Sequence, residues 1–318
     1  MFSKLRAIFT KDKTPLKAES LVFKYKDREI LDNLNLDIKK SRIVAIIGKS
    51  GSGKSTFLKL AAGVIAKSFR GKIRILGKRR PFSKKDIGYV PQEVSLIPDF
   101  SIEENLKLFG GINGLNEKKS LSEGILLLKE LHLEESIGNK PTELSGGQRV
   151  RLNIIISLLH DPAVIILDEP FVGLDFFNRR LLWHFFKSLK NKGKSVVLTT
   201  HLLSEIEEHA DQILVLGRGK IQVSGSSSQI KEKLKANKVL ELKFDKKLTE
   251  ENLHDINEYC RKKTVKLLDN YDDIAMFSIE SENQKKFLQN FLTKHRMKHT
   301  ILTYKVPSLD EAFMRASK

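Results

Sequence analysis

The first two thirds of the chain alternate short apolar runs with amphipathic stretches. Runs rich in β-branched residues predict buried strands at Ile43–Ile47, Ile87–Val90, Val164–Leu167, Ser195–Thr199 and Ile213–Leu216. Apolar residues at helical spacing predict helices over Thr56–Ala66, Ile102–Leu108 and Arg180–Lys190. Because strands and helices alternate, we expect an α/β domain with a largely parallel sheet.

The pattern changes towards the C-terminus. Gly225–Ser228 predicts a loop before a Lys-rich helix over Gln229–Ala236. The order strand, helix, strand, strand, helix, strand, helix that follows is typical of a small split βαβ, ferredoxin-like α+β domain. Its expected strands are Val239–Phe244, Thr264–Leu268, Ile274–Ile279 and His299–Tyr304, and its expected helices are Glu250–Lys262, Asn283–Met297 and Leu309–Ala316. We therefore expect a basic extension over residues 1–17, the α/β domain over 18–232 and the small domain over 233–318.

Composition narrows the class of protein. The 318 residues fit two domains of roughly 150 residues each. A chain that is 40% apolar and 30% charged is ordinary for a globular protein and argues against disorder. No apolar run approaches the ~18 residues that span a bilayer. The single cysteine, Cys260, cannot form an internal disulfide, which favours a reducing compartment, and the charged N-terminus argues against a cleaved secretion signal.

Positive charge is in excess, because 57 Lys and Arg residues against 39 Asp and Glu residues give a net charge of +18. Nucleic acid, an anionic membrane face and a phosphorylated ligand would each favour such a charge, and composition leaves the three open. Residues 1–17 combine basic side chains with an apolar helical stripe. That combination fits either a helix on a membrane surface or a solvated terminus.

One loop carries the pattern of a phosphate-binding site. It lies directly after the expected strand Ile43–Ile47 and before a helix, the context that this pattern needs. Glycines let backbone amides approach phosphate oxygens, and the helix start adds unpaired amides and a positive dipole end. We expect Lys54 to reach the β- and γ-phosphates and the Ser55 hydroxyl to bind Mg²⁺. The loop matches G-x-x-x-x-G-K-[ST] and comprises Gly48, Lys49, Ser50, Gly51, Ser52, Gly53, Lys54, Ser55 and Thr56.

Two carboxylates follow the expected strand Val164–Leu167. Alternation along a strand would direct Asp168 and Glu169 to opposite sides, so that one holds a metal and the other faces a reacting water. An acidic residue at the C-terminal end of a buried strand is the second half of a P-loop NTPase site. Glu169 is the candidate general base, because hydrolysis needs a water that is deprotonated or oriented in line with the γ-phosphate.

A second anion-binding loop is predicted far along the chain from the first. Ser145 is a good helix N-cap, and Gly146 and Gly147 leave the amides of a helix start exposed. One γ-phosphate does not need two such cradles from a single chain. The economical interpretation is that a second copy of the protein presents Leu144–Gln148 across an interface. A capped helix with a Gly-Gly turn is the alternative for these five residues taken alone.

In order and spacing, these motifs resemble the nucleotide-binding subunit of an ATP-binding-cassette (ABC) transporter over residues 18–225. The resemblance implies ATP hydrolysis with Mg²⁺. It also implies the P-loop NTPase fold of ABC ATPases: a parallel core sheet, an antiparallel subdomain and a helical subdomain. The helical subdomain carries the signature loop Leu144–Gln148.

The resemblance also assigns roles to residues. Asp168 is the implied metal-side acid and Glu169 the catalytic base, and His201 contacts the γ-phosphate. Gln92 touches Mg²⁺, beside Ser55 and Asp168, and signals to a membrane partner. The residues implied to contact nucleotide outside the first loop are Tyr25, which stacks on adenine, Ser145, Gly146, Gly147 and Gln148, which close on the ATP of the other subunit, and Asp175, in the loop that crosses the dimer interface.

Two further stretches narrow the branch of the family. Leu96–Leu106 is similar to the region after the glutamine in exporter-type subunits, and Pro307–Phe313 resembles the closing motif of their small accessory domain. Such subunits pair with separately encoded permeases. The resemblance therefore implies a homodimer around two ATP molecules that works on the cytoplasmic face of the membrane through an integral-membrane permease.

The chain departs from the family pattern at two places. Arg151–Ser157 stands where the family usually has an alanine-rich stretch, and Val172 where Ser is common, which leaves details of signalling between subunits open. One alternative is an ABC ATPase without a permease, serving translation, repair or iron–sulfur assembly. Another is a nucleic-acid-binding protein that uses ATP as a switch. Because the chain has no aromatic-plus-basic RNA-binding motif, we expect no nucleic-acid partner.

Overall fold

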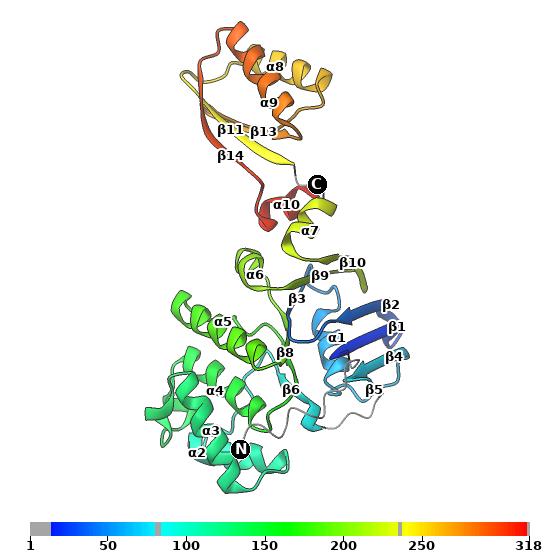
Figure 1. Cartoon of the computed structure of the whole chain (residues 1–318), viewed down its shortest axis with the longest axis vertical. Coiled ribbons are helices and arrows are strands. Elements are labelled where there is room, and N and C mark those ends of the chain that lie inside the picture. The colour runs from blue at the N-terminus through cyan, green and yellow to red at the C-terminus, as the bar shows by residue number, and fades with distance from the viewer. Residues whose placement is uncertain (1–13, 80–83, 235–236, 317–318) are drawn as a thin grey trace. The chain divides into compact units, whose positions relative to one another are not determined.

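The computed structural model describes residues 14–79, 84–234 and 237–316. The chain divides into two compact units, Met1–Ile230 and Lys231–Lys318, just before the boundary expected between residues 232 and 233 (Figure 1). None of the helices in the described ranges is both long enough and apolar enough to cross a membrane.

Unit 1 is built on a six-stranded sheet with the order β10-β9-β3-β8-β7-β6. All neighbours pair in parallel except β10, which runs antiparallel to β9. Every residue of β3, β7 and β8 is buried, which is why these strands appear in the sequence as continuous apolar runs. The strands are β3 (Ile43–Ile47), β6 (Ile87–Val90), β7 (Val164–Leu167), β8 (Ser195–Thr199), β9 (Gln212–Gly217) and β10 (Lys220–Gly225). The expected parallel sheet is confirmed.

A second sheet of unit 1 is antiparallel, with the order β2-β1-β4-β5. Its strands are β1 (Leu16–Tyr25), β2 (Arg28–Ile38), β4 (Arg70–Ile75) and β5 (Lys78–Arg79). Alternate residues of β1 join one hydrophobic core with α1 and the parallel sheet. Leu16 is fully buried in β1, so the strand begins inside the segment 1–17 expected as an extension. Residues 1–13 of that segment lie outside the described residues.

Unit 1 contains a group of helices that pack on one another. This group, α2, α3 and α4, forms the helical subdomain, on the opposite side of the parallel sheet from the antiparallel sheet (Figure 1). The helices of unit 1 are α1 (Lys54–Ala61), α2 (Ile102–Ile112), α3 (Glu117–Glu130), α4 (Gly146–Leu158), α5 (Phe176–Asn191), α6 (Leu203–His209) and α7 (Ser227–Lys233), the last crossing the division between the units. Short 3₁₀ turns occupy Lys84–Asp86, Glu134–Ser136 and Pro141–Glu143.

Several expected boundaries in unit 1 are wrong: α2 continues beyond Leu108 to Ile112, and α5 begins at Phe176, before Arg180. Helix α1 ends at Ala61 rather than Ala66, because Gly63 takes a left-handed φ of 81°. Gly225–Ser228 is not wholly a loop, since α7 begins at Ser227. The Ser226 hydroxyl accepts a hydrogen bond from the amide of Gln229, and the Gln229 side chain accepts one from the amide of Ser226, so the serines start a capped helix.

Unit 2 has the expected ferredoxin-like topology. Its four strands lie in the order β12-β13-β11-β14, all antiparallel. The apolar faces of the sheet, α8 and α9 enclose a separate core that includes Cys260. The elements are β11 (Lys238–Phe244), α8 (Glu250–Lys262), β12 (Lys266–Tyr271), β13 (Ile274–Ile279), α9 (Glu282–Lys294), β14 (His299–Lys305) and α10 (Leu309–Ala316). β12 is shifted from its expected position: it starts after Thr264, which has φ 56°, and continues beyond Leu268 to Tyr271. α9 ends before Arg296, also at φ 56°, and not at the expected Met297.

Candidate active site

A pocket of about 390 Å³ opens at the edge of the parallel sheet where β3, β6, β7 and β8 end at their carboxyl termini. Ligands bind at this edge in open α/β sheets, because the loops that follow the strands converge there. The pocket is lined by Tyr25, Arg28, Ile30, Ser50, Gly51, Gly53, Lys54, Ser55, Thr56, Gln92, Glu169, Val172 and His201. It therefore brings together the phosphate-binding loop, the glutamine, the catalytic carboxylate and the histidine that the sequence singled out.

The phosphate-binding loop leads from β3 into α1. Its Gly53 is the N-cap of α1 with φ 103°, and a Cβ there would lie 2.8 Å from Leu31 Cδ2, so only glycine fits. No side chain caps this helix start, which leaves amides free for an anion. Gly51 has φ 75° and open space within 4 Å of an added Cβ, so the loop leaves room for phosphate oxygens.

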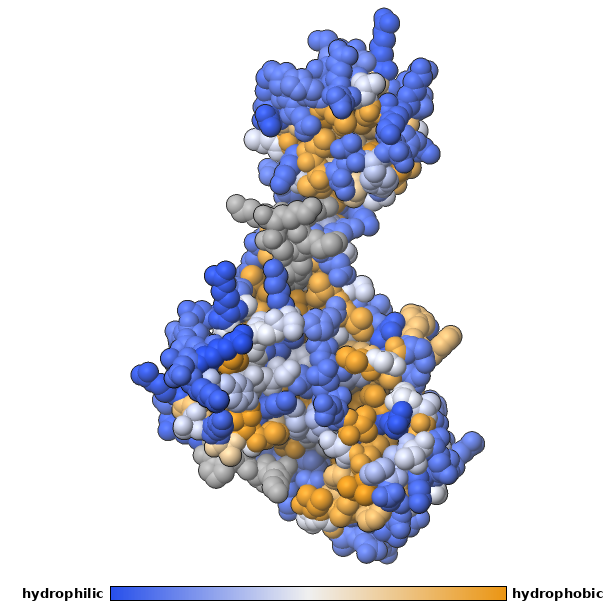
Figure 2. Space-filling view, turned by 180° about the vertical axis from the view of Figure 1, so that it is seen from behind, coloured by the Kyte–Doolittle hydropathy of each residue, from blue (hydrophilic) through white to orange (hydrophobic). Residues whose placement is uncertain are grey.

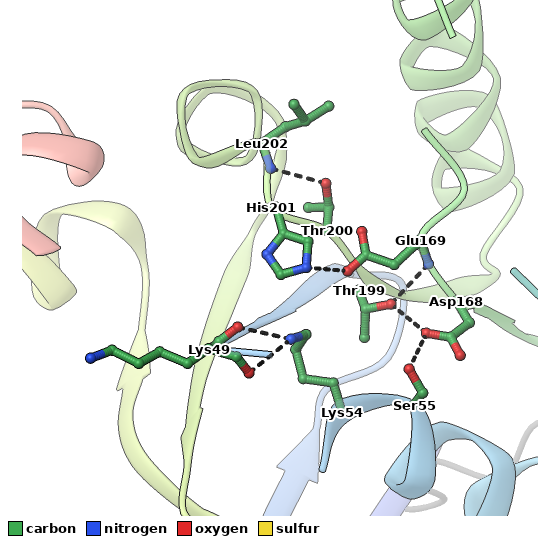
Figure 3. A network of polar contacts seen from close by, with 10 residues as sticks. Lys49, Lys54, Ser55, Asp168, Glu169, Thr199, Thr200, His201 and Leu202 are labelled. Carbon is green, nitrogen blue, oxygen red and sulfur yellow. Dashed lines mark hydrogen bonds and ion pairs between the residues drawn. The ribbon is translucent and has the colours of Figure 1, made fainter. Parts of the chain in front are cut away.

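The ammonium group of Lys54 is held by the loop itself. Lys54 Nζ donates hydrogen bonds to the carbonyls of Gly48, at 2.8 Å, and Lys49, at 3.3 Å. Figure 3 shows that the Lys49 side chain points away, so Lys49 takes part through its backbone. Burial lowers the pKa of Lys54, while the nearby charges of Glu169 and Asp168 act to raise it. A largely buried cation among carbonyls is thus placed next to the pocket, where a phosphate would complete its charge balance.

Asp168 is buried, and its carboxylate joins two elements. Its Oδ1 accepts hydrogen bonds from Ser55 Oγ, at 2.9 Å, and from Thr199 Oγ1, at 2.8 Å. Thr199 Oγ1 in turn accepts the amide hydrogen of Glu169 at 2.9 Å (Figure 3). Sequence reasoning missed Thr199 as a site residue. The available signal was the hydroxyl of Thr199 at the end of a buried strand. This strand is the next one in the chain after the strand that the two acids follow.

Glu169 and Asp168 point in different directions, as expected, but strand alternation is not the cause. β7 ends at Leu167, and Glu169 has a left-handed φ of 51°, which turns its side chain towards His201. Glu169 Oε1 lies 3.0 Å from His201 Nε2. Burial raises the pKa of Glu169, and His201 and Lys54 partly oppose that rise. A carboxylate with a raised pKa at the wall of a pocket is suited to accept a proton.

The aromatic residue expected to stack on adenine lies at the open end of the pocket. Tyr25 is 39% exposed, and its ring meets Phe23 edge-on at 4.8 Å. Lys67 Nζ lies 5.4 Å from the centre of the Tyr25 ring. Arg28, Ile30 and Val172 also line the pocket, although none of them was predicted as a site residue. Arg28 and Ile30 lie on β2, which follows Tyr25 after a tight turn and pairs with the strand that carries it.

The expected signature loop does not line this pocket. Ser145 caps α4: its hydroxyl accepts the Gln148 amide hydrogen at 3.2 Å, and Gln148 Oε1 accepts that of Ser145 at 2.8 Å. Asp175 caps α5: its Oδ1 accepts the amide hydrogen of Asn178 at 2.9 Å. A Cβ on Gly147 would lie 3.0 Å from Asn178 Nδ2, so the signature loop lies beside the start of α5. The remaining expected contacts, Ser145, Gly146, Gly147, Gln148 and Asp175, are therefore gathered together, but outside the pocket of their own chain.

The oxygen donors at this site fit Mg²⁺. Ser55 and Gln92 line the pocket, and Ser55 Oγ lies 2.9 Å from Oδ1 of the buried Asp168. Mg²⁺ prefers oxygen ligands and is commonly held by one or two protein carboxylates with water and substrate phosphates. No group of three or more His, Cys, Asp or Glu side chains able to hold a metal exists in the described ranges. This donor set thus suits an ion that a nucleotide brings with it.

Comparison with known proteins agrees with this geometry. The sequence model of the family described as ABC transporter matches residues 31–172. The chain is 33% identical over 222 residues to an uncharacterised ABC transporter ATP-binding protein of Methanocaldococcus jannaschii, covering 70% of this chain and 81% of that protein. It is likewise 33% identical over 222 residues to the Nod factor export ATP-binding protein I of Rhizobium etli, covering 69% and 70%.

Solved structures give the same result. The ATP-binding subunit of an ABC transporter superposes with a TM-score of 0.64 at 29% identity, covering 70% of this chain and 94% of that one. A dimeric bacterial ABC transporter cassette superposes with a TM-score of 0.61 at 27% identity, covering 66% and 98%. The pocket, the order of its motifs and these relatives lead to one conclusion: the chain belongs to the family of ABC transporter ATP-binding proteins and is an ATPase.

Proposed function

We propose that this chain is the ATPase subunit of an exporter. Two copies enclose two ATP molecules, each bound by the phosphate-binding loop of one copy and the signature loop of the other. The observation that carries the proposal is the separation of the two loops. The pocket at the sheet edge holds the phosphate-binding loop, while Ser145–Gln148 presents a second set of helix-start amides outside it. A relative named for Nod factor export supports the direction of transport, and a dimeric relative supports the assembly.

Within each site, the residues divide the work of hydrolysis. Lys54 and the amides at the start of α1 bind the phosphates, and the ring of Tyr25 stacks on the adenine. Ser55 and Asp168, with Gln92, hold Mg²⁺, which neutralises charge on the phosphate oxygens when it is bound. Glu169 accepts the proton of the attacking water, because burial raises the pKa of its carboxyl group and so strengthens the carboxylate as a base. His201, 3.0 Å from Glu169, fixes the direction of that carboxylate.

The membrane partner docks on the helical subdomain. Figure 2 shows apolar side chains gathered over this subdomain, at the lower right of the view from behind. Four exposed apolar side chains lie on α2 or between Gln92 and α2, and we call them the docking patch: Val94, Phe100, Leu108 and Ile112. Such a patch next to the residue that contacts the metal fits an intracellular segment of a permease. The chain then works at the inner face of the membrane, attached through that permease.

The substitution Glu169→Gln tests the assignment of the base. It removes the proton acceptor and keeps the size of the side chain. We expect ATP affinity to be unchanged and turnover to fall by about 10²–10⁴-fold, which is roughly 3–5 kcal/mol of barrier. The slow enzyme should accumulate as an ATP-bound dimer, measured by light scattering with and without ATP. Wild-type turnover, or a monomer at saturating ATP, would contradict the proposal.

A further inference from the structure

The chain segment that carries Gln92 is attached to α4 on both sides. On the N-terminal side, a Cβ on Gly88 would lie 2.6 Å from the carbonyl oxygen of Ser157, so the backbones of β6 and α4 are in close contact. Ser157 Oγ also lies 2.9 Å from the carbonyl oxygen of Tyr89. On the C-terminal side, the amide of Ser95 donates a hydrogen bond to Asn153 Oδ1 at 3.2 Å.

Asn153 is a buried polar residue among apolar neighbours. It is 4% exposed and lies on α4 among buried apolar residues, Leu152 and Ile154–Ile156. Burying a carboxamide is unfavourable unless it is hydrogen-bonded. The side-chain oxygen of Asn153, Oδ1, accepts a hydrogen bond from the amide of Ser95. This contact with the Gln92 segment accounts for a polar residue at this place in the helix.

The segment beyond Ser95 is held just as firmly. Asn105 of α2 is fully buried, and its side chain accepts the amide hydrogen of Ile97 at 2.9 Å. Its Nδ2 lies within hydrogen-bond distance of the carbonyl oxygens of Ile97, Phe100 and Ser101, at 3.1, 3.0 and 2.9 Å. Hydrogen bonds therefore link the segment 95–101 to two helices of the helical subdomain, to α4 through Asn153 and to α2 through Asn105.

We propose that Asn153 is a positioning residue that couples Gln92 to the signature loop. α4 runs unbroken from Gly146 to Leu158, so a helix displaced at Asn153 is displaced at its capped start, Ser145. When nucleotide engages Gln92, the hydrogen bond from Ser95 to Asn153 transmits the shift to α4 and aligns the signature loop with the partner copy. This coupling rests on the proposed dimer. Loss of the coupling should weaken the association of two copies and leave the binding of ATP to a single copy unchanged.

The test uses Asn153→Ala in the full-length Glu169→Gln protein. Affinity for a fluorescent ATP analogue, measured on the dilute monomer, should stay within about twofold of the parent. ATP-dependent dimerisation, measured by analytical ultracentrifugation, should weaken about tenfold, which is the 1.4 kcal/mol of one lost hydrogen bond. Asn153→Asp keeps an acceptor for the Ser95 amide, so it should dimerise more tightly than Asn153→Ala.

A matched control is Ser120→Ala in α3. Ser120 is fully buried, and its hydroxyl donates to the carbonyl of Asn116 at 2.9 Å, so its loss also destabilises the helical subdomain but away from the Gln92 segment. Dimerisation of this control should match the parent. Equal dimerisation of parent and Asn153→Ala, or equal weakening in Ser120→Ala, would overturn the coupling. A Glu169→Gln parent that stays monomeric in ATP would instead refute the dimer itself, and the coupling with it.

Discussion

Glu169 and its neighbours show how single residues set the chemistry of the site. Its left-handed backbone separates its carboxylate from that of Asp168, and the Thr199 hydroxyl holds both residues by bonding the amide of one and the carboxylate of the other. A non-glycine residue at such a φ is strained by about 1–2 kcal/mol. The bond from Thr199 offsets part of that strain, so the two adjacent carboxylates are held apart.

The pH dependence of turnover follows from the environment of Glu169. Burial raises its pKa and the charge of His201 lowers it, and the base must be deprotonated to work. Turnover should therefore fall as the pH drops through a pKa above the usual range of Glu. His201→Ala removes the opposing charge, so this acid limb should move to higher pH in a rate profile. His184→Ala, a histidine that does not line the nucleotide pocket, should leave the limb in place. A limb unmoved by His201→Ala would contradict this account.

At the scale of elements, helix starts carry the anion-binding capacity of the molecule. α1 begins without a side-chain cap, which leaves its amides for phosphate, whereas α4 begins with a capping box of Ser145 and Gln148. The cap fixes the position of the two glycines that follow Ser145. α8 of unit 2 begins with an equivalent box of Thr249 and Asn252, far along the chain from the signature loop, and so provides a comparison.

Removing either cap should destabilise the protein to a similar extent. Ser145→Ala and Thr249→Ala each delete one side-chain acceptor at a helix start, so each should lower the free energy of unfolding of its unit by about 1 kcal/mol in urea. Only Ser145→Ala should also weaken ATP-dependent dimerisation, because only that cap orients the signature loop. Equal effects of the two variants on dimerisation would show that general stability, and not loop position, is responsible.

At the scale of the whole molecule, each of the two units has its own hydrophobic core. The core of unit 1 joins the parallel and antiparallel sheets around α1, and it sets the edge at which the pocket forms. The core of unit 2 is built from its own sheet and helices. ATP chemistry resides in unit 1, and its output is expected at the docking patch. There Leu108 and Ile112 are one helical turn apart and share a face of α2.

Charging that face should uncouple the ATPase from its partner. With Leu108→Glu and Ile112→Glu together, we expect ATP turnover of the purified protein to be retained, because neither residue lines the pocket. Co-purification of an integral-membrane protein from solubilised membranes should be lost, since the docking patch is no longer apolar. Leu126→Glu, on the exposed part of α3, is the control and should keep the partner. Retention of the partner by the double variant would place the docking surface elsewhere.

The sequence by itself determined the features that depend on neighbours in the chain. The buried strands β3, β6, β7 and β8 have the predicted bounds, and the phosphate-binding loop, the acids and the capped signature loop lie where their motifs placed them. Boundaries failed where a single backbone turn decides, as at Gly63 and Thr264, because a left-handed φ is reported by one residue and not by a pattern.

Only the tertiary structure decided the contacts between distant segments. Thr199 joins the two acids across adjacent strands, and Asn153 of α4 meets Ser95 in the segment that precedes α2. The signature loop also lies outside the pocket of its own chain, beside Asn178. Hydrophobic periodicity fixes which face of each element is buried, but packing alone fixes which polar groups meet once those faces are brought together.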